Sequence, residues 1–265
     1  MKTRPADLPP LPLAGEGAAA HPHESAHLHV SGTATYIDDI PELAGTLHAA
    51  LGLSPVAHGV LKSVDLAPLR ALPGVVDVIT AADIPGPNDC GPIVHDDPVL
   101  AAGHVHYVGQ PVFAVIASTR DAARRAAALA ARVLDIEPLP AILSAREAHV
   151  RQQYVLPPMQ IVRGDARAAI GAAPHHLAGQ LTVGGQEHFY LEGQVSYAVP
   201  LEDGTMRVHC STQHPSEMQH VVAKVLKLRS HDVLHLARVL GRAVHAHRSV
   251  LERHGVRHLL SLIHI

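Results

Sequence analysis

Hydrophobic and polar positions along the chain predict two stretches of regular structure, separated by loop-rich sequence around residues 146–180. In the first stretch, short aliphatic and β-branched runs are bounded by Gly, Pro and Asp, the pattern of buried strands. A helical turn is predicted from Pro68 to about Leu72. Residues 85–89 (Pro-Gly-Pro-Asn-Asp) predict a loop. The predicted strands are 47–53, 60–66, 75–80 and 112–117.

The clearest helix is predicted over residues 118–134. Residues 118–121 (Ser-Thr-Arg-Asp) have the form of a capping box, with Asp in place of the usual Glu. Pro138 and Pro140 are expected to end the helix. A face rich in alanine can approach a sheet closely, so we expect a helix-on-sheet layer. The apolar positions of that face, spaced at i, i+4, i+7 and i+11, are Ala122, Ala126, Leu129 and Val133.

A second unit is predicted from about residue 180. Strands at 197–200 and 206–210 are joined by a turn at 202–204 (Glu-Asp-Gly). A helix follows, with Pro215 suited to its first position and with apolar residues at 218, 221, 222 and 225. Within the loop-rich sequence, Asp165 is the expected N-cap of a short helix reaching Ile170.

Composition narrows the class of protein. The 265 residues are 47% hydrophobic and 17% charged, a globular balance, and the net charge of −3 argues against a nucleic-acid partner or an anionic membrane. No apolar run reaches the roughly 18–20 residues that span a bilayer, and no apolar signal core follows Met1, so a cytoplasmic location is expected. Two cysteines cannot hold an iron–sulfur cluster, and the 23 histidines are mostly scattered singly, which argues against one large metal site.

Four motifs stand out along the chain. They are 32–41 (Gly-Thr-Ala-Thr-Tyr-Ile-Asp-Asp-Ile-Pro), 107–112 (Tyr-Val-Gly-Gln-Pro-Val), 185–192 (Gly-Gln-Glu-His-Phe-Tyr-Leu-Glu) and 211–217 (Ser-Thr-Gln-His-Pro-Ser-Glu). In this order and at similar separations, they give the chain a resemblance to the molybdenum hydroxylase family, and most closely to its xanthine dehydrogenase branch. The resemblance implies an α+β fold, namely an α/β hammerhead domain followed by the truncated start of a molybdopterin-binding domain.

The expected domain organisation combines this resemblance with the hydrophobic pattern. Order is expected to begin near Leu28, after an N-terminal arm rich in Pro, Ala, Gly and His. The expected segments are 1–27 for a flexible arm, 28–145 for the hammerhead domain, 146–179 for a linker, 180–233 for the start of the molybdopterin-binding domain and 234–265 for a tail unlike the family.

The resemblance also implies a chemistry. The family hydroxylates a carbon beside a ring nitrogen with oxygen from water, in this branch taking xanthine or hypoxanthine to urate. A molybdenum–molybdopterin cofactor performs that step, and electrons leave through iron–sulfur clusters and FAD on a partner subunit or domain to NAD. The full-length subunit is expected to be part of an oligomer.

Four residues match family positions near the cofactor. Gln213 matches the glutamine whose side-chain amide faces the apical molybdenum oxygen, whereas Gln186, Glu187 and His188 match a motif that supports the cofactor region. The sequence alone favours a polar residue at 213 that satisfies the first turn of the following helix, and the resemblance reverses that preference. Glu217 fits a favourable charge at that helix N-terminus, and two glycines at 184–185 are weak evidence for a phosphate cradle.

Family parts expected after residue 233 are missing from this sequence. The resemblance implies a glycine-rich loop and a later general-base glutamate, but residues 234–265 hold one acid, Glu252, among many Arg and His. We therefore expect no catalytic residue in this chain and no activity from it alone. Our hypothesis is a frameshift near 234, with an ending that resembles translated sequencing adapter; resequencing that found one uninterrupted frame would refute it.

Other interpretations remain open. The tail pairs His231/His235 and His254/His258 have an i, i+4 spacing that could bind a metal on a helical face, although no third ligand is evident, and the tail could form a basic amphipathic helix. The chain could instead be a non-catalytic hammerhead module that binds partner subunits, or belong to an aldehyde- or carbon monoxide-oxidising branch. Residues 36–41 and 186–192 favour the xanthine branch, and Gln213 disfavours a pure binding module.

Overall fold

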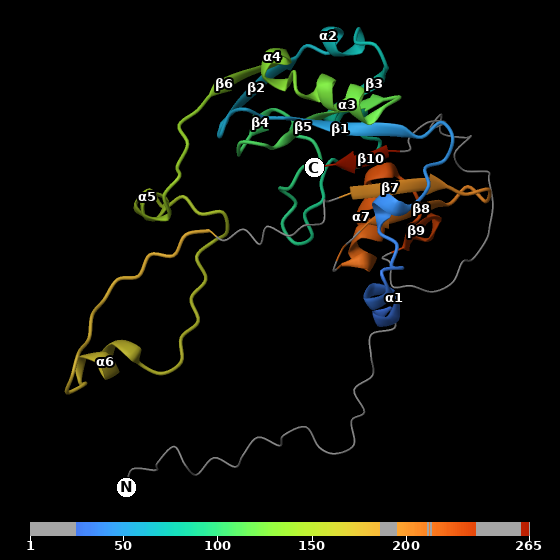
Figure 1. Ribbon diagram of the computed structural model, residues 1–265. Coiled ribbons are helices and arrows are strands. Elements are labelled where there is room, and N and C mark those ends of the chain that lie inside the picture. The colour runs from blue at the N-terminus through green and yellow to red at the C-terminus, as the bar shows by residue number, and fades with distance from the viewer. Residues whose placement is uncertain (1–24, 186–194, 211, 213, 237–260, 265) are drawn as a thin grey trace, which may run out of the picture.

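The computed structural model describes residues 25–185, 195–210, 212, 214–236 and 261–264. It contains a seven-stranded mixed sheet of order β3-β5-β1-β10-β7-β8-β9 and a three-stranded sheet of order β4-β2-β6 (Figure 1). The strands β1 to β6 belong to the first part of the chain, and β7 to β9 belong to the second part. This arrangement gives the expected two-part α+β layout.

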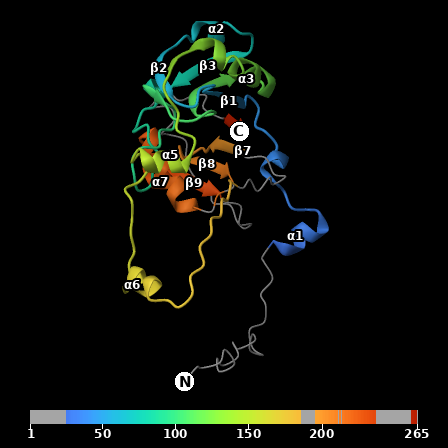
Figure 2. The ribbon, with the colours of Figure 1, turned by 90° about the vertical axis from the view of Figure 1, so that its left-hand side faces the viewer.

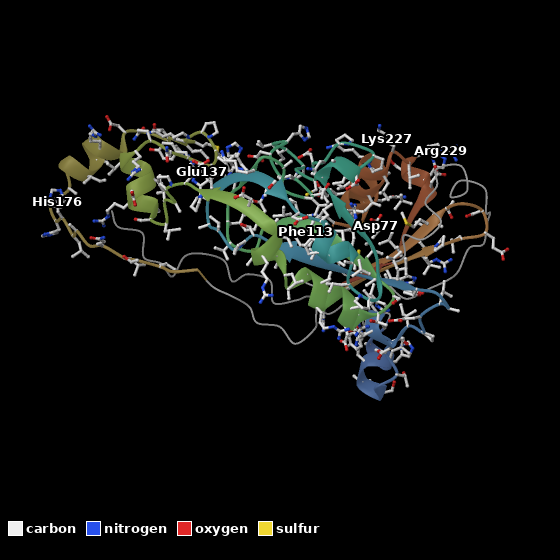
Figure 3. The ribbon with its side chains drawn as sticks, turned by 90° about the horizontal axis from the view of Figure 1, so that it is seen from above. Asp77, Phe113, Glu137, His176, Lys227 and Arg229 are labelled. Carbon is white, nitrogen blue, oxygen red and sulfur yellow. The ribbon has the colours of Figure 1, made fainter. Side chains whose placement is uncertain are left out.

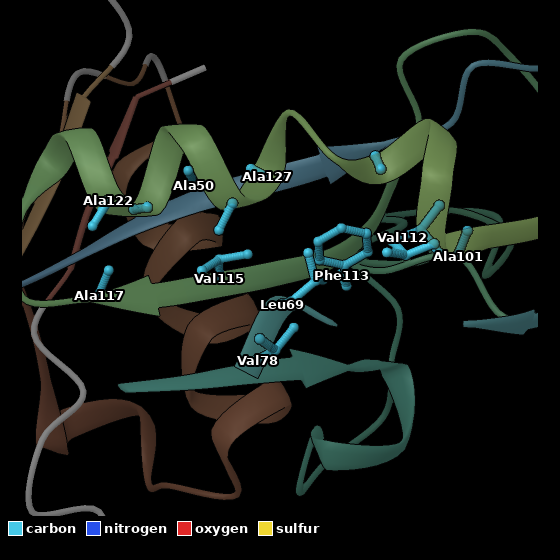
Figure 4. Close-up of a cluster of buried hydrophobic side chains, with 14 of the residues drawn as sticks. Ala50, Leu69, Val78, Ala101, Val112, Phe113, Val115, Ala117, Ala122 and Ala127 are labelled. Atoms are coloured by element: carbon cyan, nitrogen blue, oxygen red, sulfur yellow. The ribbon is translucent and has the colours of Figure 1, made fainter. Parts of the chain in front are cut away.

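The first part is built on three antiparallel strands, β3 (Val75–Thr80), β5 (Pro111–Ala117) and β1 (Leu47–Leu53). These strands confirm the predictions at 47–53 and 75–80, and β5 begins one residue before its predicted start. Helix α3 (Arg120–Ala127) lies across β1 and β5 (Figure 4). Its buried face is entirely alanine, so helix and sheet pack closely around the fully buried ring of Phe113.

The prediction of one helix over 118–134 is wrong in its extent. Helix α3 ends at Ala127, a second short helix α4 (Ala130–Val133) follows, and the chain then enters strand β6 (Leu134–Pro138). Thr119, rather than Ser118, is the N-cap, and its hydroxyl accepts the N–H of Ala122 at 3.2 Å. Residues 134–137 alternate apolar and acidic side chains, a period that fits a strand, and β6 pairs with β2 (Gly59–Val64).

The small sheet adds β4 (His104–Val105) to the other edge of β2. The predicted helical turn near 68–72 is α2 (Ala67–Arg70), whose Leu69 is fully buried in the core of the first part. Helix α1 (Ala26–Ser31) begins two residues before the position at which order was expected. Two 3-10 turns, η2 (Ile37–Asp39) and η3 (Ala81–Asp83), precede β1 and follow β3.

The second part contains the predicted hairpin of β7 (Val195–Pro200) and β8 (Met206–Cys210). Helix α7 (Pro215–Leu226), with Pro215 in its first turn as predicted, then leads through the 3-10 turn η4 (Ser230–Asp232) to β9 (Val233–Leu236). Strand β9 is parallel to β8, so β8, α7 and β9 form a βαβ unit. Its small core centres on the buried residues Val208, Ala223 and Val233.

Strand β10 (Ser261–His264) lies between the two parts. It is parallel to β1 and antiparallel to β7, and it joins the strands of both parts into one sheet. No helix in the described part of the chain combines the length and the apolar character that a bilayer crossing requires.

Residues 139–185 form a long arm that leaves the two sheets. The arm holds two short helices, α5 (Ala145–Val150) and α6 (Ala166–Gly171), and both views show α6 standing clear of the sheets (Figures 1 and 2). Figure 3 shows His176, just after α6, far from the Phe113 core. Asp165 is the N-cap of α6 as predicted, because its carboxylate accepts the N–H of Ala168 at 2.9 Å.

Backbone and side-chain groups of the two parts also form hydrogen bonds outside the sheet. The N–H of Gly86 donates to the carbonyl of Val225 at 2.8 Å, and Lys224 Nζ lies 2.8 Å from Asp89 Oδ2. These contacts hold the loop 84–103 against the C-terminal end of α7. On the other side, the Leu43 N–H donates to the hydroxyl of Tyr197 at 3.1 Å.

Candidate functional site

Strands β7, β8 and β9 of the seven-stranded sheet begin or end at one common edge. Strands β7 and β8 are antiparallel with Ser196 opposite Cys210, so the chain enters β7 beside the point where it leaves β8. Strands β8 and β9 are parallel with His209 beside Leu236, so the chain also leaves β9 at this edge. Residues 195, 210 and 236 therefore lie together at the carboxyl ends of β8 and β9. Ligands of sheets with parallel strands commonly bind at such an edge.

A short turn joins β8 to α7 at this edge. The hydroxyl of Thr212 accepts the N–H of His214 at 3.1 Å, so this hydrogen bond spans position 213. His214 then has φ −123° and ψ 63°, and Pro215 starts the helix. The Thr212–His214 hydrogen bond, the backbone conformation of His214 and Pro215 together shape the chain just before the helix. The sequence analysis missed this turn, although a Thr two residues before the helix N-cap is a recognisable signal for it.

The N-terminus of α7 opens toward the same edge. His214, its N-cap, makes no side-chain capping hydrogen bond, and the aligned peptide dipoles give this end a partial positive charge. Glu217 lies in the first turn of α7 and complements that charge, which agrees with the interpretation made from the sequence. The edge therefore offers backbone donors to a ligand that is rich in hydrogen-bond acceptors.

The four residues predicted to lie near a cofactor fall outside the described residues. Gln186, Glu187 and His188 precede β7 in the sequence, and Gln213 follows β8, so the positions of these four residues stay predictions. Gly184 and Gly185 are described, and a Cβ added at either would have no neighbour within 4 Å. Neither glycine is needed for a close approach, so the structure gives no support to a phosphate cradle there.

The start of β9 is held by polar contacts around η4. Arg229 donates through two guanidinium nitrogens to the carboxylate of Asp232, each at 2.8 Å, and this ion pair lowers the pKa of Asp232. The side-chain amide of Gln219, on α7, donates to the carbonyls of Ser230 at 2.8 Å and Val233 at 2.6 Å. These bonds fix η4 against α7 and so set where β9 runs beside β8.

Cys210, at the carboxyl end of β8, is the described thiol closest in sequence to this edge. Its side chain lies on the β8 face that packs against α7. Burial raises the pKa of the Cys210 thiol, so the thiol stays protonated and is a poor nucleophile. On the opposite face of the hairpin, the rings of Tyr197 and His209 stack with centroids 5.9 Å apart.

The proposed histidine pairs of the tail do not form a helical metal site in the described residues. His231 lies in the 3-10 turn η4 and His235 in strand β9, so the interpretation that they share a helical face is wrong. His254 and His258 lie outside the described residues. Within the described ranges, no group of three or more His, Cys, Asp or Glu side chains is placed so that it could hold a metal ion.

Comparison with known proteins decides the family. Residues 31–137 match the family model for the aldehyde oxidase and xanthine dehydrogenase a/b hammerhead domain, and residues 147–243 match the model for the molybdopterin cofactor-binding domain. The chain belongs to the aldehyde oxidase and xanthine dehydrogenase family. The expected α+β fold, a hammerhead domain followed by sequence of the molybdopterin-binding domain, is thereby confirmed.

Relatives in this family include xanthine dehydrogenases from distant organisms. The chain is 38% identical over 221 residues to that of Drosophila pseudoobscura pseudoobscura and 41% identical over 213 residues to that of Oryza sativa subsp. japonica. These matches cover 83% and 78% of this chain, but only 16% and 15% of the relatives.

Solved structures of the family share the fold. The aldehyde oxidoreductase from Desulfovibrio gigas is 25% identical with a TM-score of 0.72, over 92% of this chain and 30% of that chain. Quinoline 2-oxidoreductase from Pseudomonas putida 86 is also 25% identical, with a TM-score of 0.68, over 92% of this chain and 34% of that one.

Proposed function

We propose that this chain forms part of the molybdenum cofactor site of a xanthine dehydrogenase that oxidises xanthine or hypoxanthine to urate with oxygen from water. The observation that carries the proposal is the strand register: Ser196 pairs with Cys210, so β7 begins beside the end of β8, and the two family motifs adjoin these strand ends in the sequence. The identity of 36–41% to xanthine dehydrogenases supports the choice of branch.

Gln213 is the residue that we propose to contact the cofactor. A carboxamide N–H can donate to an oxygen of the molybdenum centre without adding charge. Position 213 lies in the sequence between Thr212 and His214, which are joined by a hydrogen bond, and Pro215 then starts α7. When bound, molybdenum converts water into a strong nucleophile at neutral pH and accepts the electrons of the oxidation.

Gln186, Glu187 and His188 would act as positioning residues. They precede β7, whose amino end adjoins the carboxyl end of β8. Polar side chains there can hold Gln213 or the pterin in one orientation through hydrogen bonds. The uncapped N-terminus of α7 suits the phosphate-bearing, acceptor-rich pterin, so the donors at this edge fit the cofactor.

The remaining parts of the reaction would come from polypeptide beyond this chain. The chain spans about 15–16% of the length of the xanthine dehydrogenases that it matches. We propose that a general-base glutamate, iron–sulfur clusters and FAD lie on the rest of the enzyme or on a partner subunit, with NAD as electron acceptor. On this proposal the chain is inactive alone and works in the cytoplasm as part of an oligomer.

Affinity purification through a tag on this chain, expressed from its own locus, tests the proposal. Elemental analysis should find molybdenum and iron in the purified complex, together with bound FAD and xanthine-dependent reduction of NAD. The same chain expressed alone should contain no stoichiometric molybdenum. A complex free of molybdenum, or one molybdenum per chain in the protein purified alone, would contradict the proposal.

One observation favours a second candidate, a non-catalytic module that binds partner subunits. The arm 139–185 exposes large apolar side chains such as Val155 at 94% and Ile161 at 89%, a surface typical of protein contacts. The pull-down separates the candidates, since a module would bring down protein without molybdenum. An aldehyde oxidase-like relative would instead retain molybdenum but oxidise aldehydes rather than purines.

A further inference from the structure

A space one strand wide separates the strands of the first part from those of the second, and β10 fills it (Figure 1). β10 is parallel to β1, with Ser261 opposite Leu47, and antiparallel to β7, with Ile263 opposite Ser196. Neighbouring strands lie about 4.8 Å apart, so β1 and β7 are roughly 10 Å from each other. We call this space, bordered by β1 and β7, the strand slot.

The two walls of the strand slot match the family models, whereas the strand inside it does not. β1 lies within residues 31–137, which match the hammerhead model, and β7 lies within residues 147–243, which match the molybdopterin cofactor-binding model. β10 follows both ranges in the sequence. Because a segment outside the family match fits between the walls, backbone pairing rather than a particular side chain is the main basis of recognition.

Contacts that do not involve β10 also hold the two walls together. Leu43, shortly before β1, donates its N–H to the hydroxyl of Tyr197 on β7 at 3.1 Å. Lys224 Nζ, on α7, lies 2.8 Å from Asp89 Oδ2 in the first part. The walls therefore remain neighbours in the absence of β10. Without an occupant, the facing N–H and C=O groups of β1 and β7 would lack strand partners, and such an edge is a template for another strand.

Burial of the walls defines the chemistry of the segment that fits. His48, Ala49 and Ala50 are consecutive in β1 and all buried, so both faces of this strand are covered, and Tyr197 on β7 is buried too. Strands covered on both faces are continuously apolar, proline is excluded from central strands, and an unpaired charge is costly there. Residues 259–265 (Leu-Leu-Ser-Leu-Ile-His-Ile) contain no Asp, Glu, Lys, Arg or Pro.

β10 uses only part of the strand slot. Its pairing covers Leu47–Ala49 of the seven-residue β1, and Val195 and Ser196 of the six-residue β7. Among the described residues, no strand pairs with Ala50–Leu53 on this side of β1. A longer extended segment would therefore pair further along both walls.

We propose that the strand slot is a binding site for an extended, uncharged apolar segment of polypeptide, which pairs with β1 and β7 through its backbone, and that Ser261–His264 occupies this site in the present chain. The occupant joins three strands of the first part to three strands of the second in one sheet, so it couples the two parts. Binding at this site involves no molybdenum chemistry, so the proposal is independent of the proposed function.

The test is binding of a free peptide to the chain shortened after residue 258. The probe is the peptide of residues 259–265, labelled for fluorescence anisotropy, and the control peptide carries Leu262→Pro and Ile263→Pro. We expect one peptide per shortened chain and no binding of the control, because proline cannot donate to a central strand. The full chain should bind the probe at least about tenfold more weakly, because its own tethered segment competes. Equal binding to the two chains, or none to a folded shortened chain, would overturn the proposal.

A second measurement uses the full chain and needs no truncation. Ala49 lies opposite Ile263, so the variant Ala49→Cys/Ile263→Cys should form an intramolecular disulfide on mild oxidation. The matched control is Ala49→Cys/Ser261→Cys, whose two positions are out of register by two residues and therefore more than about 7 Å apart, too far for a disulfide. Non-reducing mass spectrometry measures both. Equal cross-linking in the two variants, or a disulfide between two chains, would contradict the occupancy proposed for Ser261–His264.

Discussion

Gly52 on β1 lies directly opposite Phe113 on β5, and the aromatic ring fills the space that any side chain at position 52 would need. A Cβ built on Gly52 would stand 2.0 Å from Cζ of Phe113. Phe113 is fully buried in the core of the first part (Figure 4). This one glycine therefore allows the largest apolar side chain of the first core to lie flat against the sheet.

Substituting Gly52→Ala should therefore destabilise the protein. The added methyl group forces the ring or the strand to shift, and overpacking of this kind costs about 3 kcal/mol. Urea unfolding followed by circular dichroism measures the loss. Gly179→Ala is the control, because a Cβ there has no neighbour within 4 Å. An unchanged unfolding midpoint for Gly52→Ala would show that Phe113 does not occupy this space.

The alanine face of α3 should be equally intolerant of larger side chains. Ala126 is fully buried against the sheet, so Ala126→Leu has to push the helix outward, at a cost of about 1–3 kcal/mol. Ala128, at the C-terminal end of the same helix, is exposed, and Ala128→Leu should change the free energy of unfolding little. Thermal unfolding of both variants compares them directly, and equal melting temperatures would contradict the packing described here.

Much of the first part was predictable because its signals are local. The strand at 75–80 has β-branched residues between turn formers, and the structure reproduces its bounds. Strand β6 was missed because residues 134–138 follow a helical repeat without a break, although Leu134, Asp135, Ile136 and Glu137 already alternate. What makes them a strand is pairing with β2, more than 70 residues earlier, and no local pattern contains that partner.

The amide of Gln219 should be important for the position of β9. Gln219→Leu removes the amide that donates to the carbonyls of Ser230 and Val233, a loss of about 1–2 kcal/mol. In Gln219→Leu, the amides of β9 should exchange faster than in the wild-type protein, whereas those of β1 should exchange as before. Gln153→Leu, at an exposed position of the arm, is the matched control. Undisturbed protection of β9 in Gln219→Leu would mean that these bonds do not hold the strand.

The contact between the loop 84–103 and α7 predicts a dependence on pH. The hydrogen bond from Lys224 is the main reason that the pKa of Asp89 falls from its usual 3.8 to about 2. Because the folded state depresses this pKa, the stabilising contribution is present above pH 3.8 and is lost as the pH falls toward 2.

Asp89→Asn should therefore flatten the dependence of stability on pH within that window. Chemical denaturation between pH 2 and pH 5 measures the effect, with exposed Glu202→Gln as the control. The remaining slope comes from other paired carboxylates such as Asp232, whose pKa is also lowered. If Asp89→Asn loses stability on acidification as steeply as wild type, the Lys224 contact does not act as described.

The sequence identified residues of the candidate site but could not show where they lie in the fold. The motifs around Gln186 and Gln213 are separated by some 25 residues, and nothing local states that they approach each other. The antiparallel register of β7 and β8 places residues 195 and 210 at one edge, and the parallel pairing of β9 adds residue 236. Such registers depend on pairing between residues that are far apart in the sequence. The sequence therefore identified candidate residues, whereas the fold showed which strand ends lie together.

The central claim is that Gln213 meets the molybdenum centre, and its most direct test is Gln213→Ala in the assembled enzyme purified through this chain. We expect molybdenum to be retained, the Mo(V) electron paramagnetic resonance signal to shift, and turnover of xanthine to fall about tenfold to a hundredfold, the range typical of lost hydrogen bonds to the ligands of a metal. Gln153→Ala, in the arm, should match wild type. An unshifted signal with full turnover in Gln213→Ala would contradict the claim.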